Sequence, residues 1–97
     1  MINNHQKAQL KGLASTLDTK YQIGKNEISD SLLSMLDKAL TARELIKIDV
    51  MKGYTESINE LAINLSVKLN AEVVQVVGRV IVLYRRNKEN PKIKLVK

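Results

Sequence analysis

Residues 24–27 (Gly-Lys-Asn-Glu) form the part of the chain best suited to binding an anion. They lie between a short strand-like run at Tyr21–Ile23 and a strongly periodic helical stretch that begins near Ser29. A glycine turn that leads into a helix leaves several backbone N–H groups unpaired and pointing in one direction, which suits an anion. Lys25 adds a full positive charge, so we expect the loop to contact phosphate.

Side chains for catalysis or metal binding do not form a recognisable set. His5 is the only histidine, and the sequence has no cysteine, which excludes a disulfide framework and a thiolate metal site. No serine has a histidine neighbour in the sequence, so a nucleophilic triad would need residues from distant parts of the chain. Glu44 and Asp49 do not make a carboxylate dyad. We therefore expect a protein that is not an enzyme and has no metal or cofactor.

The positive charge is concentrated at the two ends of the chain. The net charge is +6, of which residues 85–97 contribute +5 and residues 1–25 contribute +3, while residues 26–84 contribute −2. If the two ends meet in space, they form a basic patch of the kind that binds a polyanion. The simpler alternative for residues 85–97 is a solvated basic tail that only aids solubility.

Length and composition indicate one small domain over residues 1–97, with a basic C-terminal tail at 85–97. Hydrophobic residues make up 44% of the 97 positions and charged residues 27%, which are ordinary values for a globular domain. No apolar run approaches the roughly 20 residues that a membrane span needs, and no signal-peptide core is found. We expect a cytoplasmic monomer.

The hydrophobic pattern predicts the element order α-β-α-β-α-β-β. Helices are expected over residues 4–16, from Ser29 to about Arg43 and after Thr55 or Ser57, because apolar residues recur at helical spacing. Asn3 and Gln6 fit a capping box for the first helix, on which Lys7 and Lys11 share one exposed face. The first helix, the loop and the tail thus each supply candidate phosphate ligands.

The strands are expected at residues 21–23, 45–50, 73–77 and 80–84. Gly78-Arg79 fits the two-residue type II′ turn of a hairpin. Because strand–helix–strand connections are right-handed, the first three strands should be mutually parallel and the fourth antiparallel to the third. Residues 80–84 are apolar on both faces, so the second and third helices should cover one face of the sheet and the first helix the other. The fold class is α/β, with a four-stranded mixed sheet.

Four motifs in the right order resemble the CRM domain (chloroplast RNA splicing and ribosome maturation), and in particular its stand-alone YhbY-type bacterial form. They are Leu10–Ala14 after Gln6-Lys7, Gln22–Asn26, Ala42–Ile48, and Val74–Arg85 with Pro91–Ile93. The resemblance implies a fold similar to the C-terminal domain of translation initiation factor three. It also implies non-catalytic binding of structured, pre-ribosomal RNA and a role in assembly of the large ribosomal subunit.

The glycine loop departs from the motif of that family, which reads Gly-x-x-Gly and is similar to the backbone clamp of KH domains. Glu27 stands where the second glycine is usual. A positive φ there would strain the backbone by roughly 1–2 kcal/mol, whereas an acid at a helix N-terminus is stabilising by about 0.3–1 kcal/mol. Both interpretations stay open.

Seven residues are the candidate RNA ligands, with the loop expected at the centre of a face between the two basic chain ends. They are Lys7, Lys11, Gly24, Lys25, Asn26, Arg85 and Arg86, with Arg43, Lys47 and Arg79 as second choices. Three tyrosines without Phe or Trp do not favour an aromatic stacking platform, so Tyr84 is expected to pack, and phosphate, 2′-OH and shape contacts should dominate. The alternatives are a DNA or nucleoid binder and an interaction module for an acidic protein.

Overall fold

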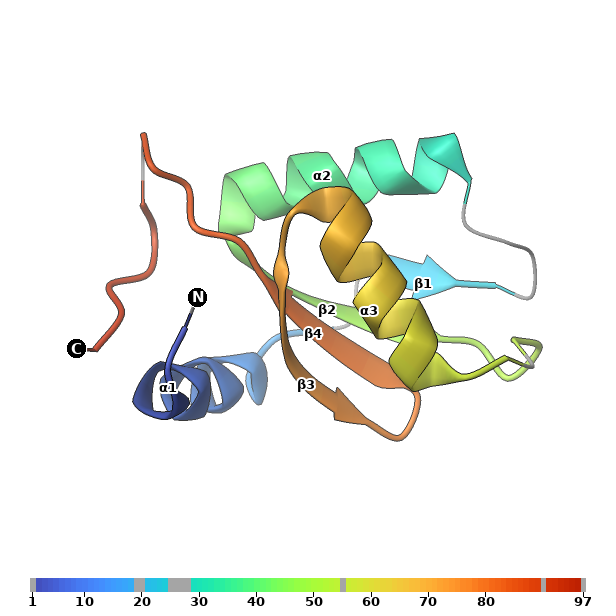
Figure 1. The fold of residues 1–97 in the computed structure, drawn as a ribbon, viewed down its shortest axis with the longest axis horizontal. Helices are drawn as coiled ribbons and strands as arrows, with labels where there is room; N and C mark the ends of the chain where they lie inside the picture. Colours follow the sequence, from blue (N-terminus) through green and yellow to red (C-terminus); the bar gives the residue numbers. More distant parts are fainter. Residues whose placement is uncertain (1, 19–20, 25–28, 55, 90, 97) are drawn as a thin grey trace.

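A computed structural model describes the chain except for residues 1, 19–20, 25–28, 55, 90 and 97. The order of helices and strands confirms the predicted one. The elements are α1 (Asn4–Ala14), β1 (Tyr21–Ile23), α2 (Asp30–Arg43), β2 (Leu45–Val50), α3 (Ile58–Leu69), β3 (Glu72–Val77) and β4 (Val80–Tyr84) (Figure 1). The main difference from the expected bounds is that α1 ends at Ala14, two residues early.

Each helix starts at a capping residue that the sequence marks. Asn3 and Gln6 form the expected capping box, with both hydrogen bonds at 2.9 Å. The hydroxyl of Ser29 accepts the N–H of Leu32 at 3.1 Å, and that of Ser57 accepts the N–H of Glu60. Each such cap contributes about 1 kcal/mol. Thr55, the other candidate for the third cap, lies outside the described residues.

The four strands form one mixed sheet in the order β1-β2-β4-β3. β1 pairs in parallel with β2, and β4 lies antiparallel between β2 and β3. The first three strands therefore run in the same direction, as predicted. Gly78 takes a φ of +57° at the first turn position of the β3–β4 hairpin, as a type II′ turn requires.

The sheet separates two apolar clusters, which explains why β4 is apolar on both faces. On one face α2 and α3 pack against buried side chains such as Ile48, Ile81 and Leu83. On the other face α1 supplies Leu10 and Ala14, which pack with Val74, Val82 and Tyr84. The expected placement of the helices on the two faces is confirmed (Figure 1).

The chain after β4 crosses the face of the sheet that carries α1. Ile93 and Leu95 pack against the second apolar cluster, while Lys92 and Lys94 stay exposed. The tail is thus packed on the domain through Ile93 and Leu95, with its basic side chains largely exposed, and is not a solvated extension. Of the helices in the described ranges, none has the length and hydropathy to cross a membrane.

Candidate nucleic-acid interface

The first candidate ligands lie on α1. The helix buries Leu10 and Ala14, and on the flank next to this buried face Lys11 is exposed and Lys7 partly exposed. Its first turn has no acidic residue, and Lys11 lies in its last turn. The helix therefore presents positive charge along the flank that borders the sheet.

α1 covers only part of its face of the sheet. The register places Gln22, Asp49 and Val80 in one row across the strands, because directly paired residues point to the same face. A hollow of about 320 Å³ lies beside α1, and Lys11 stands at its rim. Its other lining residues are Ala14, Ser15, Lys47, Gln75, Val77, Val80 and Val82. The uncovered part of the sheet is thus a shallow surface bordered by two lysines.

Lys47, a second-choice ligand, has a structural role. Its Nζ donates to the carbonyl oxygens of Ala14 at 3.3 Å and Leu17 at 3.5 Å. These oxygens belong to the C-terminal end of α1 and the turn after it, where a cation is favoured by the unpaired carbonyls and the helix dipole. Lys47 therefore holds α1 on the sheet and also adds positive charge to the hollow.

Gly24 lies at the carboxyl end of β1, beside the end of β2 and the hairpin turn. The N–H of Met51 donates to the carbonyl of Ile23, and that of Val50 to the carbonyl of Arg79, both at 2.8 Å. The guanidinium of Arg79 donates to the carbonyl of Lys52 at 3.1 Å. Gly24, Lys52 and Arg79 therefore lie together at this end of the sheet. The other loop candidates, Lys25 and Asn26, lie outside the described residues.

The side chain of Arg85 is hydrogen-bonded to α2 and α3, on the face of the sheet opposite to α1. Its guanidinium donates to the carboxylate of Asp37 at 2.7 Å, to the carbonyl of Asp37 at 2.9 Å and to the hydroxyl of Thr41 at 2.8 Å. A fourth bond, at 2.9 Å, goes to the carbonyl of Leu69 at the end of α3. Arg86, the next residue, is exposed and, among the described residues, has no ion-pair partner. The geometry thus favours Arg86 over Arg85 as a ligand for RNA.

The tail is fixed by Glu44, a residue whose role sequence reasoning missed. Glu44 is fully buried at the end of α2, with a φ of +65°. Its carboxylate accepts the backbone N–H groups of Asn87 at 2.7 Å and Ile93 at 2.7 Å, and also that of Lys92. One signal was available in the sequence, because an acid at a helix C-terminus opposes the helix dipole and needs other partners.

α1 holds the same tail from the other side. The side-chain amide of Gln9 donates to the carbonyl of Lys94 and accepts the N–H of Val96, both at 2.8 Å. Gln6 donates to the carbonyl of Val96 at 2.8 Å. The two basic ends of the chain therefore lie side by side, as the charge distribution suggested.

Gly24, the described residue of the loop, does not lie between these chain ends, where the sequence predicted the loop. Gly24 stands beside the turn that precedes β4, whereas the tail follows Tyr84 at the other end of the same strand. Five strand residues separate the two places by roughly 14 Å. In Figure 1 α1 lies near the tail, whereas β1, which Gly24 follows, lies on the other side of the molecule. The structure thus brings α1, which carries Lys7 and Lys11, beside the tail that contains Arg86, and leaves Gly24 apart from this tail.

Among the described residues, no cluster of His, Cys, Asp or Glu could hold a metal ion. The fold and this surface define a small α/β domain with a basic, partly uncovered sheet face. A family model, the CRS1 / YhbY (CRM) domain, matches residues 2–85. The chain belongs to this family, as its motifs indicated.

Relatives of known sequence and structure support the family assignment. "Probable RNA-binding protein YqeI" of Bacillus subtilis (strain 168) is 37% identical over 95 residues, which cover 98% of this chain and 99% of that protein. An "RNA-binding protein" of Haemophilus influenzae is 37% identical over 89 residues, covering 91% of this chain and 89% of the relative. The solution structure of the hypothetical protein SAV1595 from Staphylococcus aureus shares the fold with a TM-score of 0.83, 41% identity and 99% coverage of this chain and 100% of that one.

Proposed function

We propose that this protein binds structured RNA without catalysing a reaction, and that the flank of α1 that carries Lys7 and Lys11 is the centre of its RNA-binding surface. The observation that carries the proposal is the position of Lys11. It is exposed on α1 and stands at the rim of the hollow over the uncovered part of the sheet, near Lys47. Lys7 lies one helical turn before it on the same helix. The names of the relatives support RNA as the polyanion.

Gly24, Lys52 and Arg79 form a second basic surface, at the end of the sheet far from the tail. An RNA helix that lies on α1 and extends along the sheet would reach this surface, since an A-form duplex is recognised over a long stretch through phosphates and 2′-OH groups. Lys25 and Asn26 belong to the proposal because they follow Gly24 in the sequence. Arg85 is not part of it, because its guanidinium is already bonded to α2 and α3.

Charge reversal at Lys7 and Lys11 tests the surface. The double variant should bind structured RNA more weakly than the wild type while folding normally. Lys38→Glu, at an exposed position of α2 on the other side of the sheet, makes the same kind of charge change at a remote place and should have little effect. Equal affinities of the wild type and the double variant would remove α1 from the site.

Two competition experiments separate RNA binding from the alternatives. Duplex DNA lacks 2′-OH groups and should displace structured RNA poorly, whereas a DNA-binding protein would show the reverse. An acidic protein partner would survive nuclease treatment of the complex.

The biological target that we propose is precursor RNA of the large ribosomal subunit, bound during assembly by a cytoplasmic monomer. The resemblance of the motifs to YhbY-type proteins supports this role. Crosslinking in cells, followed by sequencing of the attached RNA, tests it. Reads spread evenly over messenger RNA would contradict the ribosomal assignment, and sedimentation of the purified protein tests the monomer.

A further inference from the structure

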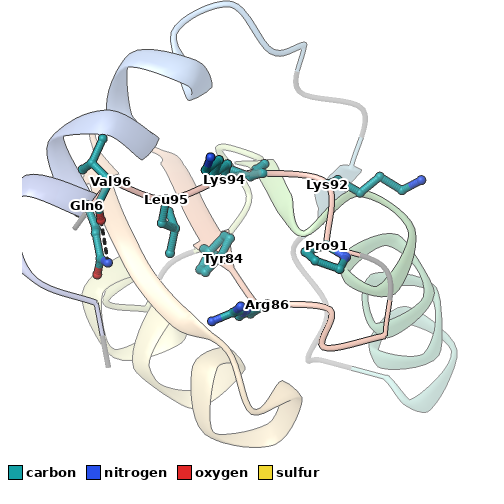
Figure 2. A pocket seen from close by; sticks show the side chains of 9 residues that line it. Gln6, Tyr84, Arg86, Pro91, Lys92, Lys94, Leu95 and Val96 are labelled. Carbon is teal, nitrogen blue, oxygen red and sulfur yellow. Dashed lines mark hydrogen bonds between the residues drawn. The ribbon is translucent and has the colours of Figure 1, made fainter.

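A cavity of about 450 Å³ lies between the tail, α1 and the end of β4. Tyr84 forms its floor, and the tail curves around it from Arg86 to Val96 (Figure 2). A smaller hollow of about 290 Å³ shares Gln6, Tyr84, Arg86 and Leu95 with this cavity. Binding pockets for small ligands begin at roughly 300 Å³, so the larger cavity has room for one.

The hydroxyl of Tyr84 is the unusual group in this cavity. The side chain is only 2% exposed, and its hydroxyl has no hydrogen-bond partner among the described residues. Burial, and next the nearby carboxylate of Glu44, raise the pKa of Tyr84, so the hydroxyl keeps its proton at neutral pH and can donate it to an acceptor. A buried polar group without a partner is costly and rare in native proteins, which suggests that a ligand supplies the missing bond.

The charges around the cavity favour an anionic ligand. Arg86 lies beside Tyr84, and Lys92 and Lys94 are among the lining residues, with the side chain of Lys92 pointing away from Tyr84 (Figure 2). The larger cavity has no acidic side chain among its described lining residues, and the adjoining hollow has one, Glu72, beside Arg85, Arg86 and Lys88. Pro91, Ile93 and Leu95 supply apolar wall, so the cavity combines positive charge, apolar surface and one buried donor.

The cavity is held open by the contacts of the tail. Glu44 binds the backbone N–H groups of Asn87 and Ile93 on one side, and Gln9 binds Lys94 and Val96 on the other. Because both sides are fixed by side chains from distant parts of the chain, a ligand would not need to order the tail first. Such preorganisation lowers the entropic cost of binding.

We infer that this cavity binds one nucleotide of the RNA, with a phosphate on Arg86 and a polar edge of the base or ribose on the hydroxyl of Tyr84. The inference rests on the proposed function. Gln6 lines the cavity and lies five residues before Lys11, about 8 Å along the helix axis and about 140° around it. The cavity and the two lysines therefore lie on different flanks of α1, and an RNA strand has to cross α1 to contact both.

Tyr84→Phe is the sharpest test because it removes only the unpartnered hydroxyl. The variant should bind structured RNA roughly 3- to 10-fold more weakly, the effect of one lost hydrogen bond. Its thermal unfolding midpoint without RNA should stay the same or rise, since no hydrogen bond within the described protein is lost. Tyr21→Phe, on the half-buried tyrosine of β1, is the matched control and should leave RNA affinity unchanged. Arg86→Gln should weaken binding about 10-fold, and Lys38→Gln should not.

Amide chemical shifts test whether the cavity binds a free nucleotide instead of one nucleotide of the RNA. Uridine monophosphate and inorganic phosphate are titrated separately into the wild type and Tyr84→Phe, and the backbone amides of Ile93 and Leu95 are followed. We expect the nucleotide to shift them in the wild type and less in the variant. If the nucleotide shifts these amides but Tyr84→Phe binds RNA normally, the cavity takes a free nucleotide and the assignment to RNA is wrong.

The remaining outcomes separate the cavity from the proposed function. RNA affinity that falls on charge reversal of Lys7 and Lys11, but not in Tyr84→Phe or Arg86→Gln, overturns the cavity and keeps the α1 surface. A wild-type protein that binds no structured RNA overturns the proposed function itself.

Discussion

The carboxylate of Glu44 accepts the backbone N–H of Ile93 at 2.7 Å, although 49 residues separate them in the sequence. The same carboxylate also accepts the N–H groups of Asn87 and Lys92. A residue in the loop between α2 and β2 thus fixes the tail over the face of the sheet that carries α1. Both the second apolar cluster and the cavity above Tyr84 depend on this tail.

Glu44→Gln should destabilise the fold by about 2–3 kcal/mol. The amide NH₂ group of glutamine cannot accept an N–H, so at least one backbone donor of the tail loses its partner, and the bonds that stay lose their charge. Urea unfolding measures the change, and hydrogen exchange at Lys92 and Ile93 should become faster. Glu56→Gln, on an exposed side chain, is the control. If the amide hydrogens of Lys92 and Ile93 exchange as slowly in Glu44→Gln as in the wild type, the carboxylate does not hold the tail.

Ionisation of the Tyr84 hydroxyl should lower the stability of the fold at alkaline pH. Its pKa is raised above 10.0 in the folded protein, chiefly by burial, so the unfolded chain loses this proton first as the pH rises. Stability from this group is therefore fully present below pH 10 and declines from there up to the folded pKa. Lysines titrate in the same range, so the measured quantity is the difference in unfolding free energy between the wild type and Tyr84→Phe across pH 9–12. A difference that does not change with pH would contradict a raised pKa.

The elements could be predicted from the sequence because their signals are local. The capping pair Asn3 and Gln6, the alternation at Leu45–Val50 and the turn at Gly78-Arg79 each lie within a few residues, and each appears in the structure. The family resemblance added the expected fold.

The arrangement of the candidate site depends on contacts between residues far apart in the sequence, so local sequence signals could not predict it. Gln9 meets Lys94 across 85 residues, and Arg85 meets Asp37 across 48. Nothing in the local sequence distinguishes Arg85, which stabilises the helices, from Arg86, which faces the cavity. Pairing of the tail with α1 also places both chain ends apart from Gly24, the described residue of the glycine loop.

Charge reversal at Lys7 and Lys11 should change the salt dependence of RNA binding as well as the affinity. Each phosphate contact that is lost reduces the slope of log affinity against log salt concentration by about 0.7–0.9. Two lost contacts should therefore lower the slope by about 1.4–1.8. Filter binding over a range of potassium chloride concentrations gives the slope. An unchanged slope with a weaker affinity would indicate a structural effect instead of lost phosphate contacts.

Gly12 and Gly24 should respond differently to alanine. At both positions an added Cβ meets no described atom within 4 Å, and neither has a positive φ. Gly12 lies inside α1, so Gly12→Ala should stabilise the fold by about 0.5–1 kcal/mol, because alanine favours a helix. Thermal unfolding measures the gain.

Gly24→Ala should leave stability within about 0.5 kcal/mol, because nothing described is displaced. RNA affinity should nevertheless fall if the RNA backbone approaches the loop closely, since a side chain there keeps phosphate away from the N–H groups. Gly12→Ala serves as the comparison for an added methyl group. Equal RNA affinities of Gly24→Ala and the wild type would remove the loop from the interface.

Arg85→Gln should destabilise the protein by about 1–2 kcal/mol without a direct effect on RNA contacts. The substitution removes bonds to Asp37, Thr41 and Leu69, which join β4 to α2 and α3. The partly exposed ion pair with Asp37, whose side chain is 57% exposed, adds little because solvent screens it, so the loss comes mainly from the bonds to backbone carbonyls. Urea unfolding gives the stability, and RNA titration at a temperature where both proteins are folded gives the affinity. A large loss of RNA affinity at unchanged stability would show that Arg85 belongs to the RNA-binding surface.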